Sequence, residues 1–391
     1  MDGEGLVKKS LESLKSYCEK EDFKGWDPYD GLNSWVTQRT FLGRIPLFRL
    51  AWIQLFKRNP VNLRKVFGVP KGYNAKGVAL FVIGYCNFMD IEPNVDVHKK
   101  KVEQLADMLI QMQSKGYSGA CWGYNFDWQA RAFYQPKWTP TVVATSFVVE
   151  ALFMAYERLG KEIYKKTALT SAEFVLKDLN KTYNDSGDYT LSYSPLDKTQ
   201  VFNAGLLGAK LLSQCAYYGD KRELFDEAKK ICQYVCKYQN LDGSWAYSLL
   251  IFHQWIDSFH TGFNLECLYA YQNLSGDDTF KDSFEKGMHY YLNNFFHSDG
   301  RAKYYNDKTY PIDIHAPAQL VVTLAKLDML NDHKALADSV LGWTINNMQH
   351  ENGFFYYQKK QGVSSKIPYM RWAQSWMFYA MSYYISKDGD A

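Results

Sequence analysis

The amino-acid sequence predicts an all-α protein, an (α/α)6 toroid in which helical hairpins form an inner ring of helices inside an outer ring. A turn of glycine and aromatic residues recurs at residues 121–124, 243–247, 300–304 and 353–357, with a degenerate copy at 189–193. The helices that follow these turns begin roughly 55 to 60 residues apart, the length of one helical hairpin and one loop. Helices with one apolar side alternate with helices that are apolar nearly all round, as expected of outer and inner layers.

The elements follow this pattern in chain order. Residues 1–40 are predicted to form an N-terminal helix and a loop, and residues 41–391 the repeated hairpins of one continuous domain, 1–391. Outer helices with one apolar side are predicted within 102–112, 224–235 and 280–291. Inner helices are predicted at 74–87, 141–155, 203–212, 316–327 and 372–384. We count six hairpins plus an extra N-terminal helix, with short β-hairpin-like loops on the face where the inner helices begin.

Composition supports one enclosed body and excludes a nucleic-acid partner. The chain has 391 residues, of which 47% are hydrophobic and 17% aromatic, and the uninterrupted repetition leaves no place for a linker between domains. The formal net charge is +3. Lysine and arginine are spread along the chain and do not form the basic stripe that a nucleic-acid interface needs.

The sequence also predicts a cytoplasmic protein with no metal and no other cofactor. The first residues, MDGEG, are acidic and precede an amphipathic helix instead of the apolar segment of a secretory signal. Seven cysteines, an odd number, lie mostly within helix patterns, where we expect them to be reduced and buried. Cys232 and Cys236 are one helical turn apart, but no second pair of metal ligands accompanies them.

Residues 41–71 combine apolar residues with arginine and lysine. The segment reads FLGRIPLFRLAWIQLFKRNPVNLRKVFGVPK, and it is too short and too charged to span a bilayer. One interpretation is an inner or capping helix with solvated ends. The alternative is peripheral contact with a membrane, because aromatic residues on one side and bases on the other suit anionic lipid.

Long loops before the inner helices carry the side chains that we expect to bind a ligand. In an α/α toroid every inner helix begins on the same side, so these loops converge over one central depression. Their tryptophan and tyrosine residues alternate with polar ones, which suits sugars: C–H faces pack on aromatic rings, and hydroxyls need hydrogen-bond partners. Core packing is the alternative role for any one of these aromatic residues. The candidate substrate-binding residues are Trp122, Tyr124, Trp128, Arg131, Trp138, Trp245, Tyr247, Trp255, Tyr304, Arg371, Trp372 and Gln374.

Acidic and imidazole side chains at equivalent loop positions are the candidate catalytic residues. Asp127, Asp257 and Asp313 precede inner helices, and His260 and His315 follow the last two of these aspartates. With Asp127 as acid and Asp313 as base, the protein would be a glycoside hydrolase that uses paired carboxylates. Helix N-capping is the non-catalytic explanation for Asp257 and Asp313.

A second hypothesis uses the imidazoles. His260, His315 or a tyrosine would remove the C5 proton of a uronate, and Arg131 or Arg371 would neutralise the uronate's carboxylate, which gives a lyase or an epimerase. Both hypotheses require an oligosaccharide or polysaccharide as the substrate.

Two of the turns resemble the repeat motif of triterpene cyclases. Residues 239–245 read QNLDGSW and fit Q-x-x-x-G-x-W, and residues 349–355, QHENGFF, are a close variant. Those cyclases and protein prenyltransferases are also α/α toroids, so the resemblance implies the fold. The chain lacks the D-x-D-D and D-C-T-A-E signatures of the cyclases and the D-x-C zinc pair of the prenyltransferases. A terpene cyclase-like enzyme would need a dry aromatic tunnel with one acidic group.

A broader resemblance covers the chain from about residue 27 to its C-terminus. The blocks WDPYDGLNS at 26–34, CWGYNFDWQ at 121–129 and TPTVVATS at 139–146 are similar to VpsJ-type proteins of bacterial polysaccharide biosynthesis, a group similar in architecture to six-hairpin glycosidases. The resemblance implies a polysaccharide context. It adds Asp27, Asp30, Asn125 and Gln129 to the substrate-site candidates.

We therefore expect a carbohydrate-active protein of polysaccharide metabolism, with a glycoside hydrolase-like enzyme as the first hypothesis. A non-catalytic polysaccharide-binding or assembly protein is the competing hypothesis, because toroids also serve as docking platforms. Two carboxylates facing each other across an open pocket would favour catalysis. Carboxylates that cap helices or pair with arginine in a filled core would favour binding.

Overall fold

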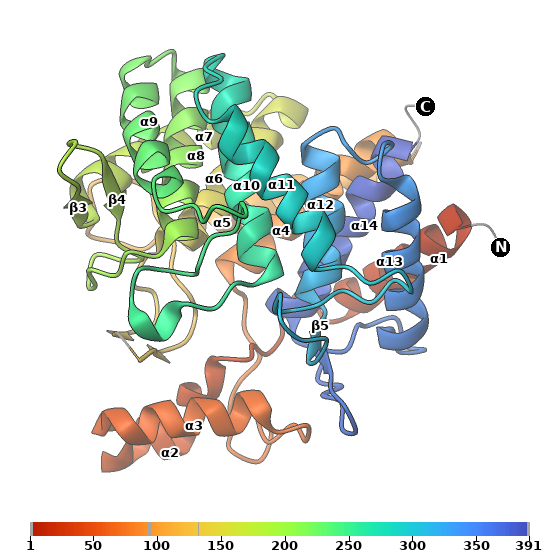
Figure 1. Ribbon diagram of the computed structural model, residues 1–391. Helices are drawn as coiled ribbons and strands as arrows, with labels where there is room; N and C mark the ends of the chain where they lie inside the picture. Colours follow the sequence, from red (N-terminus) through yellow and green to blue (C-terminus); the bar gives the residue numbers. More distant parts are fainter. Residues whose placement is uncertain (1–2, 93–94, 132, 389–391) are drawn as a thin grey trace.

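The helices of the protein form two rings, one inside the other. The computed structural model describes residues 3–92, 95–131 and 133–388. Each inner helix packs against the next, and the last packs against the first, so the inner ring is closed. The inner helices are α4 (Ala75–Ile91), α6 (Val142–Leu159), α8 (Phe202–Gly219), α10 (Ser258–Ser275), α12 (His315–Lys326) and α14 (Ser375–Asp388). The outer helices are α5 (Val95–Gln111), α7 (Glu162–Glu173), α9 (Glu223–Cys236), α11 (Lys281–Asn294), α13 (Lys334–Met348) and α1 (Gly3–Lys20) (Figure 1).

The predicted (α/α)6 toroid is confirmed, with one correction at the N-terminus. The helix expected as an extra element, α1, packs against both α13 and α14 and is the sixth outer helix. Its buried residues Val7, Leu11, Leu14 and Cys18 lie on one side of the helix. The sixth hairpin therefore consists of α14 and α1, and a search for repeats along the chain misses it because its two helices are far apart in sequence.

The recurring glycine turns fix each repeat against the next outer helix. Gly243, Gly300 and Gly353 have φ angles of 92°, 85° and 91°, a backbone conformation that favours glycine. A Cβ atom at each position would lie 2.3 Å from a backbone oxygen, in α11, α13 and α1 respectively. This close approach explains why glycine recurs with the period of the repeat. It also places α1 in a position equivalent to that of the other outer helices.

Short strands and single helical turns shape the loops before the inner helices. Strand β1 (Trp128–Gln129) pairs with β2 (Tyr134–Gln135), β3 (Lys181–Tyr183) with β4 (Tyr189–Leu191), and β5 (Ile312–Asp313) with β6 (Gln358–Lys359), all antiparallel. The first two pairs are β-hairpins, as expected, whereas β5 and β6 come from different repeats. The remaining turns are η1 (Asp30–Asn33), η2 (Phe41–Arg44), η3 (Phe174–Asp178), η4 (Ile251–His253) and η5 (Met370–Gln374).

Two helices, α2 (Trp35–Arg39) and α3 (Pro46–Arg58), lie outside the rings (Figure 1). Helix α3 buries Ile53 and Phe56, whereas Phe41 and Leu47 are 71% and 76% exposed. The segment 41–71 is thus a cap with an exposed apolar side. Among the described residues no helix combines the length and the apolar character needed to cross a bilayer. Peripheral membrane contact through the exposed side stays a prediction.

The inner ring is tightly packed where α4 and α14 close it. A Cβ atom added at Gly84 would lie 2.4 Å from the ring of Phe378, which is fully buried. We expect Gly84→Ala to lower the free energy of unfolding by about 1–3 kcal/mol, because the phenylalanine cannot move away. At Gly342 in α13, nothing lies within 4 Å of an added Cβ atom, so Gly342→Ala should raise that free energy by up to about 1 kcal/mol. Urea unfolding curves measure the free energy of unfolding of both variants. The same change in both would contradict tight packing between α4 and α14.

A layer of buried charges crosses the middle of the inner ring. Glu150 of α6 accepts a hydrogen bond from Lys210 of α8 at 2.7 Å and another from Lys326 of α12. Lys326 also lies 3.4 Å from Glu266 of α10. Because a buried charge is costly without a partner, these contacts hold four inner helices in one arrangement.

Acid should weaken this layer. Burial raises the pKa of Glu150, but Lys210 and Lys326 outweigh burial and lower the pKa to about 2. A carboxylate with a lowered pKa stabilises the fold above its unfolded pKa and loses that effect as the pH falls through the folded pKa. We expect Glu150→Gln to remove roughly 3 kcal/mol of stability near pH 6 and little near pH 2. Denaturant unfolding with exposed Glu223→Gln as the control measures this, and a difference from wild type that persists in acid would contradict it.

Candidate functional site

A cavity of about 490 Å³ lies at the end of the inner ring where the inner helices begin. Its walls come from the loops before these helices and from η5, and helix α3 lies across it with Leu50, Ile53, Gln54, Lys57 and Arg58. Aromatic side chains form much of the lining. The convergence of the loops that the fold class predicts is therefore observed.

His260 enters the cavity from the first turn of α10. Asp257 caps this helix by accepting the backbone N–H of His260 at 2.9 Å. Its second carboxylate oxygen accepts Nδ1–H of the same histidine at 2.7 Å and Nε1–H of Trp255 at 3.2 Å. Asp257 thus fixes the imidazole through Nδ1. The other nitrogen, Nε2, is left for a ligand.

His315, the first residue of α12, lies close to His260. Both imidazoles contact the ring of Phe259, with centroid distances of 4.1 Å for His260 and 4.4 Å for His315. Neither ring nitrogen of His315 has a hydrogen-bond partner among the described residues. Burial, followed by the charge of Lys76, lowers the pKa of His315 well below its usual value. The imidazole is therefore held in its neutral form, in which one ring nitrogen donates and the other accepts a hydrogen bond.

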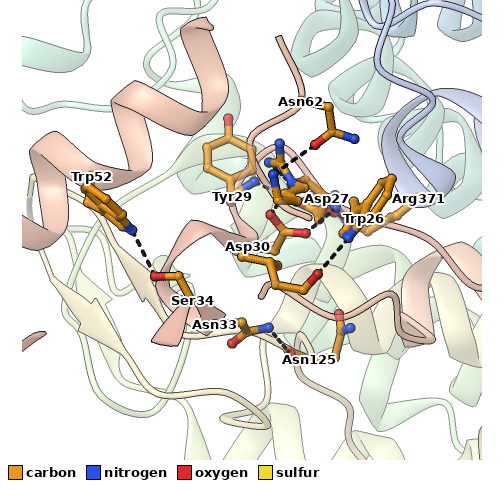
Figure 2. A network of polar contacts seen from close by, with 12 residues as sticks. Trp26, Asp27, Tyr29, Asp30, Asn33, Ser34, Trp52, Asn62, Asn125 and Arg371 are labelled. Carbon is orange, nitrogen blue, oxygen red and sulfur yellow. Dashed lines mark hydrogen bonds and ion pairs between the residues drawn. The ribbon is translucent and has the colours of Figure 1, made fainter. Parts of the chain in front are cut away.

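Arg371 of η5 lines the cavity and is fixed by a buried ion pair. Its Nε and Nη2 donate to the two carboxylate oxygens of Asp27 at 2.5 and 2.9 Å. Arg64 holds the loop that carries Asp27, because it donates to Asp30 and to the carbonyl oxygen of Asp27, both at 2.6 Å. Figure 2 shows this network around Asp27 and Asp30. The two aspartates, which were predicted to bind substrate, instead position Arg371 from behind the cavity wall.

Asp313 supports Trp372, the neighbour of Arg371. Its carboxylate is fully buried and accepts hydrogen bonds from Nε1 of Trp372 at 2.8 Å, Nε2 of Gln358 at 2.6 Å and the backbone N–H of His315 at 3.0 Å. Burial raises the pKa of Asp313 to about 6, and the three hydrogen bonds oppose that rise. Asp313 therefore holds Trp372 and the first turn of α12 in place.

Lys76, in the first turn of α4, reaches the inner end of the cavity. Its side chain is 3% exposed, and Nζ lies 4.1 Å from the ring centroid of Phe147 and 5.0 Å from those of Phe263 and Trp376. Burial and the nearby guanidinium of Arg371 lower the pKa of Lys76 well below its usual value. The amine is thus enclosed by aromatic faces, and an anion beside it would favour its charged form.

The structure brings many of the predicted residues together and leaves others elsewhere. Those that line the cavity are Tyr124, Trp128, Gln129, Arg131, Tyr247, Trp255, His260, Tyr304, His315, Arg371 and Trp372. Trp122 and Trp245 are instead buried between helices, where they donate to backbone carbonyls of α5 and α9. Gln374 bonds the backbone of Phe355. Asn125 contacts Asn33 and Asn74, and Trp138 is 45% exposed and does not line the cavity.

None of the predicted carboxylates lies on the cavity lining. Asp127 accepts hydrogen bonds from Gln38 at 3.1 Å and from the backbone N–H of Lys137 at 2.8 Å. Asp257 bonds His260 and Asp313 bonds Trp372, each from the side away from the cavity. The geometry therefore does not support Asp127 and Asp313 as an acid and base that face each other across a sugar.

Several lining residues were not predicted from the sequence. They include Tyr29, Lys57, Lys76, Tyr193 and Asn203. A signal existed for Lys76, because it is the only charged residue in the run AKGVALFVIGYC and a lysine is rarely buried without a purpose. No comparable signal pointed to Lys57, since nothing in the segment 41–71 says which side of α3 faces the cavity.

Several solved structures share this fold. A cellobiose 2-epimerase from Bacillus thermoamylovorans has a TM-score of 0.62, with 11% identity over 81% of this chain and 90% of its own. An unsaturated glucuronyl hydrolase specific for heparin has a TM-score of 0.63, with 12% identity over 99% and 97%. An α-mannanase from Bacteroides thetaiotaomicron has a TM-score of 0.64, with 11% identity over 81% and 87%. The protein therefore has the fold of the six-hairpin toroids, which include glycoside hydrolases and sugar epimerases.

No protein-family model matches the chain, and no curated protein matches it in sequence. The resemblance to VpsJ-type proteins consequently stays a hypothesis.

Proposed function

We propose that this protein is a carbohydrate-active enzyme that moves a proton at a sugar carbon beside a carbonyl or carboxylate group, as an epimerase, isomerase or lyase does. The observation that supports this most is that His260 and His315 share contacts with Phe259 in an aromatic cavity, whose lining also includes His253. Within the described part of the chain, the lining of this cavity includes no aspartate or glutamate. Proton transfer at carbon needs an acid and a base within reach of one atom, and the imidazoles are the lining groups that suit this task.

Each polar group has a role in this proposal. One imidazole removes the proton, and the electron pair of the broken C–H bond moves into the adjacent carbonyl group. Arg371, fixed by Asp27, stabilises the negative charge that develops on the oxygen. In an epimerase the other imidazole returns a proton to the opposite face of the carbon. Trp128, Trp255 and Trp372 provide flat surfaces for the sugar ring.

The epimerases of the same fold support a sugar substrate for this reaction, and so does a D-mannose isomerase with a TM-score of 0.59. Hydrolysis by paired carboxylates has less support, because Asp127, Asp257 and Asp313 are absent from the lining. A terpene cyclase-like reaction lacks its acidic group on the lining for the same reason. A cytoplasmic location and a place in polysaccharide metabolism remain hypotheses from the sequence.

Exchange of carbon-bound hydrogen with solvent tests the proposal. The protein is incubated in D₂O with cellobiose, D-mannose, D-glucuronate and oligosaccharides that contain uronates, and the products are followed by NMR. We expect deuterium at one sugar carbon, with an epimer, an isomer or an unsaturated product. Release of new reducing ends without deuterium incorporation would support the hydrolase instead. Binding of sugar without any turnover would support a non-catalytic binding protein.

A further inference from the structure

The charges on the cavity lining are of one sign. Lys57, Arg58, Lys76, Arg131 and Arg371 all line the cavity, and the described lining residues include no carboxylate. Asp257 and Asp27 do not line the cavity, because they lie behind His260 and Arg371, to which they are bonded. A ligand therefore meets lysine and arginine groups and never a carboxylate, and such a field favours a negatively charged substrate.

Lys76 is the most informative of these cations. Arg371 is already paired with Asp27, and Lys57 donates to the hydroxyl of Tyr29 at 2.7 Å. Lys76 is buried, and in the described part of the chain its Nζ has aromatic rings as neighbours and neither a hydrogen bond nor an ion pair. A buried amine becomes charged most readily beside an anion, and the cavity is the side from which such a partner can reach this one.

The imidazoles and Lys76 share their surroundings. Phe263 contacts His260 and His315 at centroid distances of 5.9 and 5.8 Å, and the same ring lies 5.0 Å from Nζ of Lys76. Trp376 contacts both His315, at 4.1 Å, and Nζ of Lys76, at 5.0 Å. An anionic group paired with Lys76 would thus lie in the part of the cavity that the imidazoles line.

We propose that the substrate is a uronate whose carboxylate pairs with Lys76, so that C5 and its hydrogen lie between His260 and His315. This inference rests on the proposed function and gives it a substrate class. Loss of the C5 proton to an imidazole sends the electron pair into the carboxylate, and Lys76 neutralises the added negative charge. Return of a proton to the other face of C5 gives the epimer. Alternatively, the C4–O bond breaks. The leaving oxygen takes the electron pair of that bond and then a proton, and the sugar becomes the unsaturated product of a lyase.

Matched pairs of sugars test this inference. D-Glucuronate is compared with D-glucose, and D-galacturonate with D-galactose, because each pair differs only at C6. Binding is followed by the fluorescence of the tryptophans that line the cavity. For the wild-type protein we expect each uronate to bind roughly 10- to 100-fold more tightly than its neutral partner. Lys76→Met should abolish this preference, Lys76→Arg should retain part of it, and the exposed control Lys115→Met should leave it unchanged.

The outcomes separate this inference from the proposed function. Equal binding of uronates and neutral sugars by the wild-type protein overturns the inference, and this test does not depend on any variant folding. Tighter binding of D-glucose 6-phosphate than of D-glucuronate also overturns it, because the anion would then sit farther from C5. Proton exchange into neutral sugars alone would support the proposed function and contradict a uronate as the substrate. Binding of uronates through Lys76 without any proton exchange would support the uronate as the ligand and contradict the proposed function.

Discussion

Replacement of His260 by asparagine is expected to lower the rate of deuterium incorporation by about 10²- to 10⁴-fold, which is the contribution of a general acid or base. Sugar binding should change little, because asparagine keeps the polarity of the site and leaves its aromatic walls in place. The initial rate from NMR and the dissociation constant from fluorescence measure the two quantities separately. A variant that retains the wild-type rate would remove His260 from the proposed mechanism.

Asp257→Asn separates the positioning role of this carboxylate from catalysis. The amide oxygen can still accept the backbone N–H of His260 and cap α10, but the charge that holds the imidazole is lost. We expect a decrease in turnover of about 10²- to 10⁴-fold, because an amide no longer holds the tautomer and orientation of the imidazole. The matched histidine control is His289→Asn on the exposed side of α11, which should behave as the wild type does.

Loss of the buried partner of Arg371 should give the largest change in stability. Asp27→Ala leaves the Arg371 guanidinium in the interior without its carboxylate, and breaking a buried pair in this way costs about 3–5 kcal/mol of unfolding free energy. Urea unfolding of the variant measures this. The matched control is Glu285→Ala, which breaks the pair of Lys281 and Glu285, 4.0 Å apart with both side chains more than half exposed. That change should cost less than about 1 kcal/mol.

A double variant tests the reason for the expected loss. Adding Arg371→Met to Asp27→Ala removes the uncompensated charge, so the double variant should be more stable than Asp27→Ala alone. If Asp27→Ala costs no more than the exposed control, the ion pair does not hold η5 in place, and Arg371 loses its proposed orientation.

The fold could be predicted because its determinants are local and repeated. The glycine at each turn is required by the close approach of the next outer helix, and the apolar character of each inner helix follows from its position inside the ring. The equivalence of α1 to the other outer helices could not be predicted in this way. It depends on a contact between Gly353 and the backbone of Ser13, and no local pattern records that contact.

The site was predictable only in part, because the sequence gives the types of residues but not the direction in which they point. His260, His315 and Arg371 were recognised from their place in the loops, and they line the cavity. Asp127, Asp257 and Asp313 were chosen by the same reasoning and do not, since an aspartate before a helix serves equally well as a cap or as a partner of a neighbouring side chain. Lys76 is not among the predicted residues, because the apolar character of its helix indicates core.

The hairpin formed by α14 and α1 has a consequence for synthesis of the protein on the ribosome. Helix α1 is translated before α14, and its apolar stripe of Val7, Leu11 and Leu14 finds its inner partner only after α14 has been made. Until then the nascent chain exposes this stripe and an open edge of the inner ring, which are surfaces that chaperones bind and through which incomplete chains aggregate. The sixth hairpin therefore needs a contact between segments that are far apart in the sequence, and such long-range contacts form slowly.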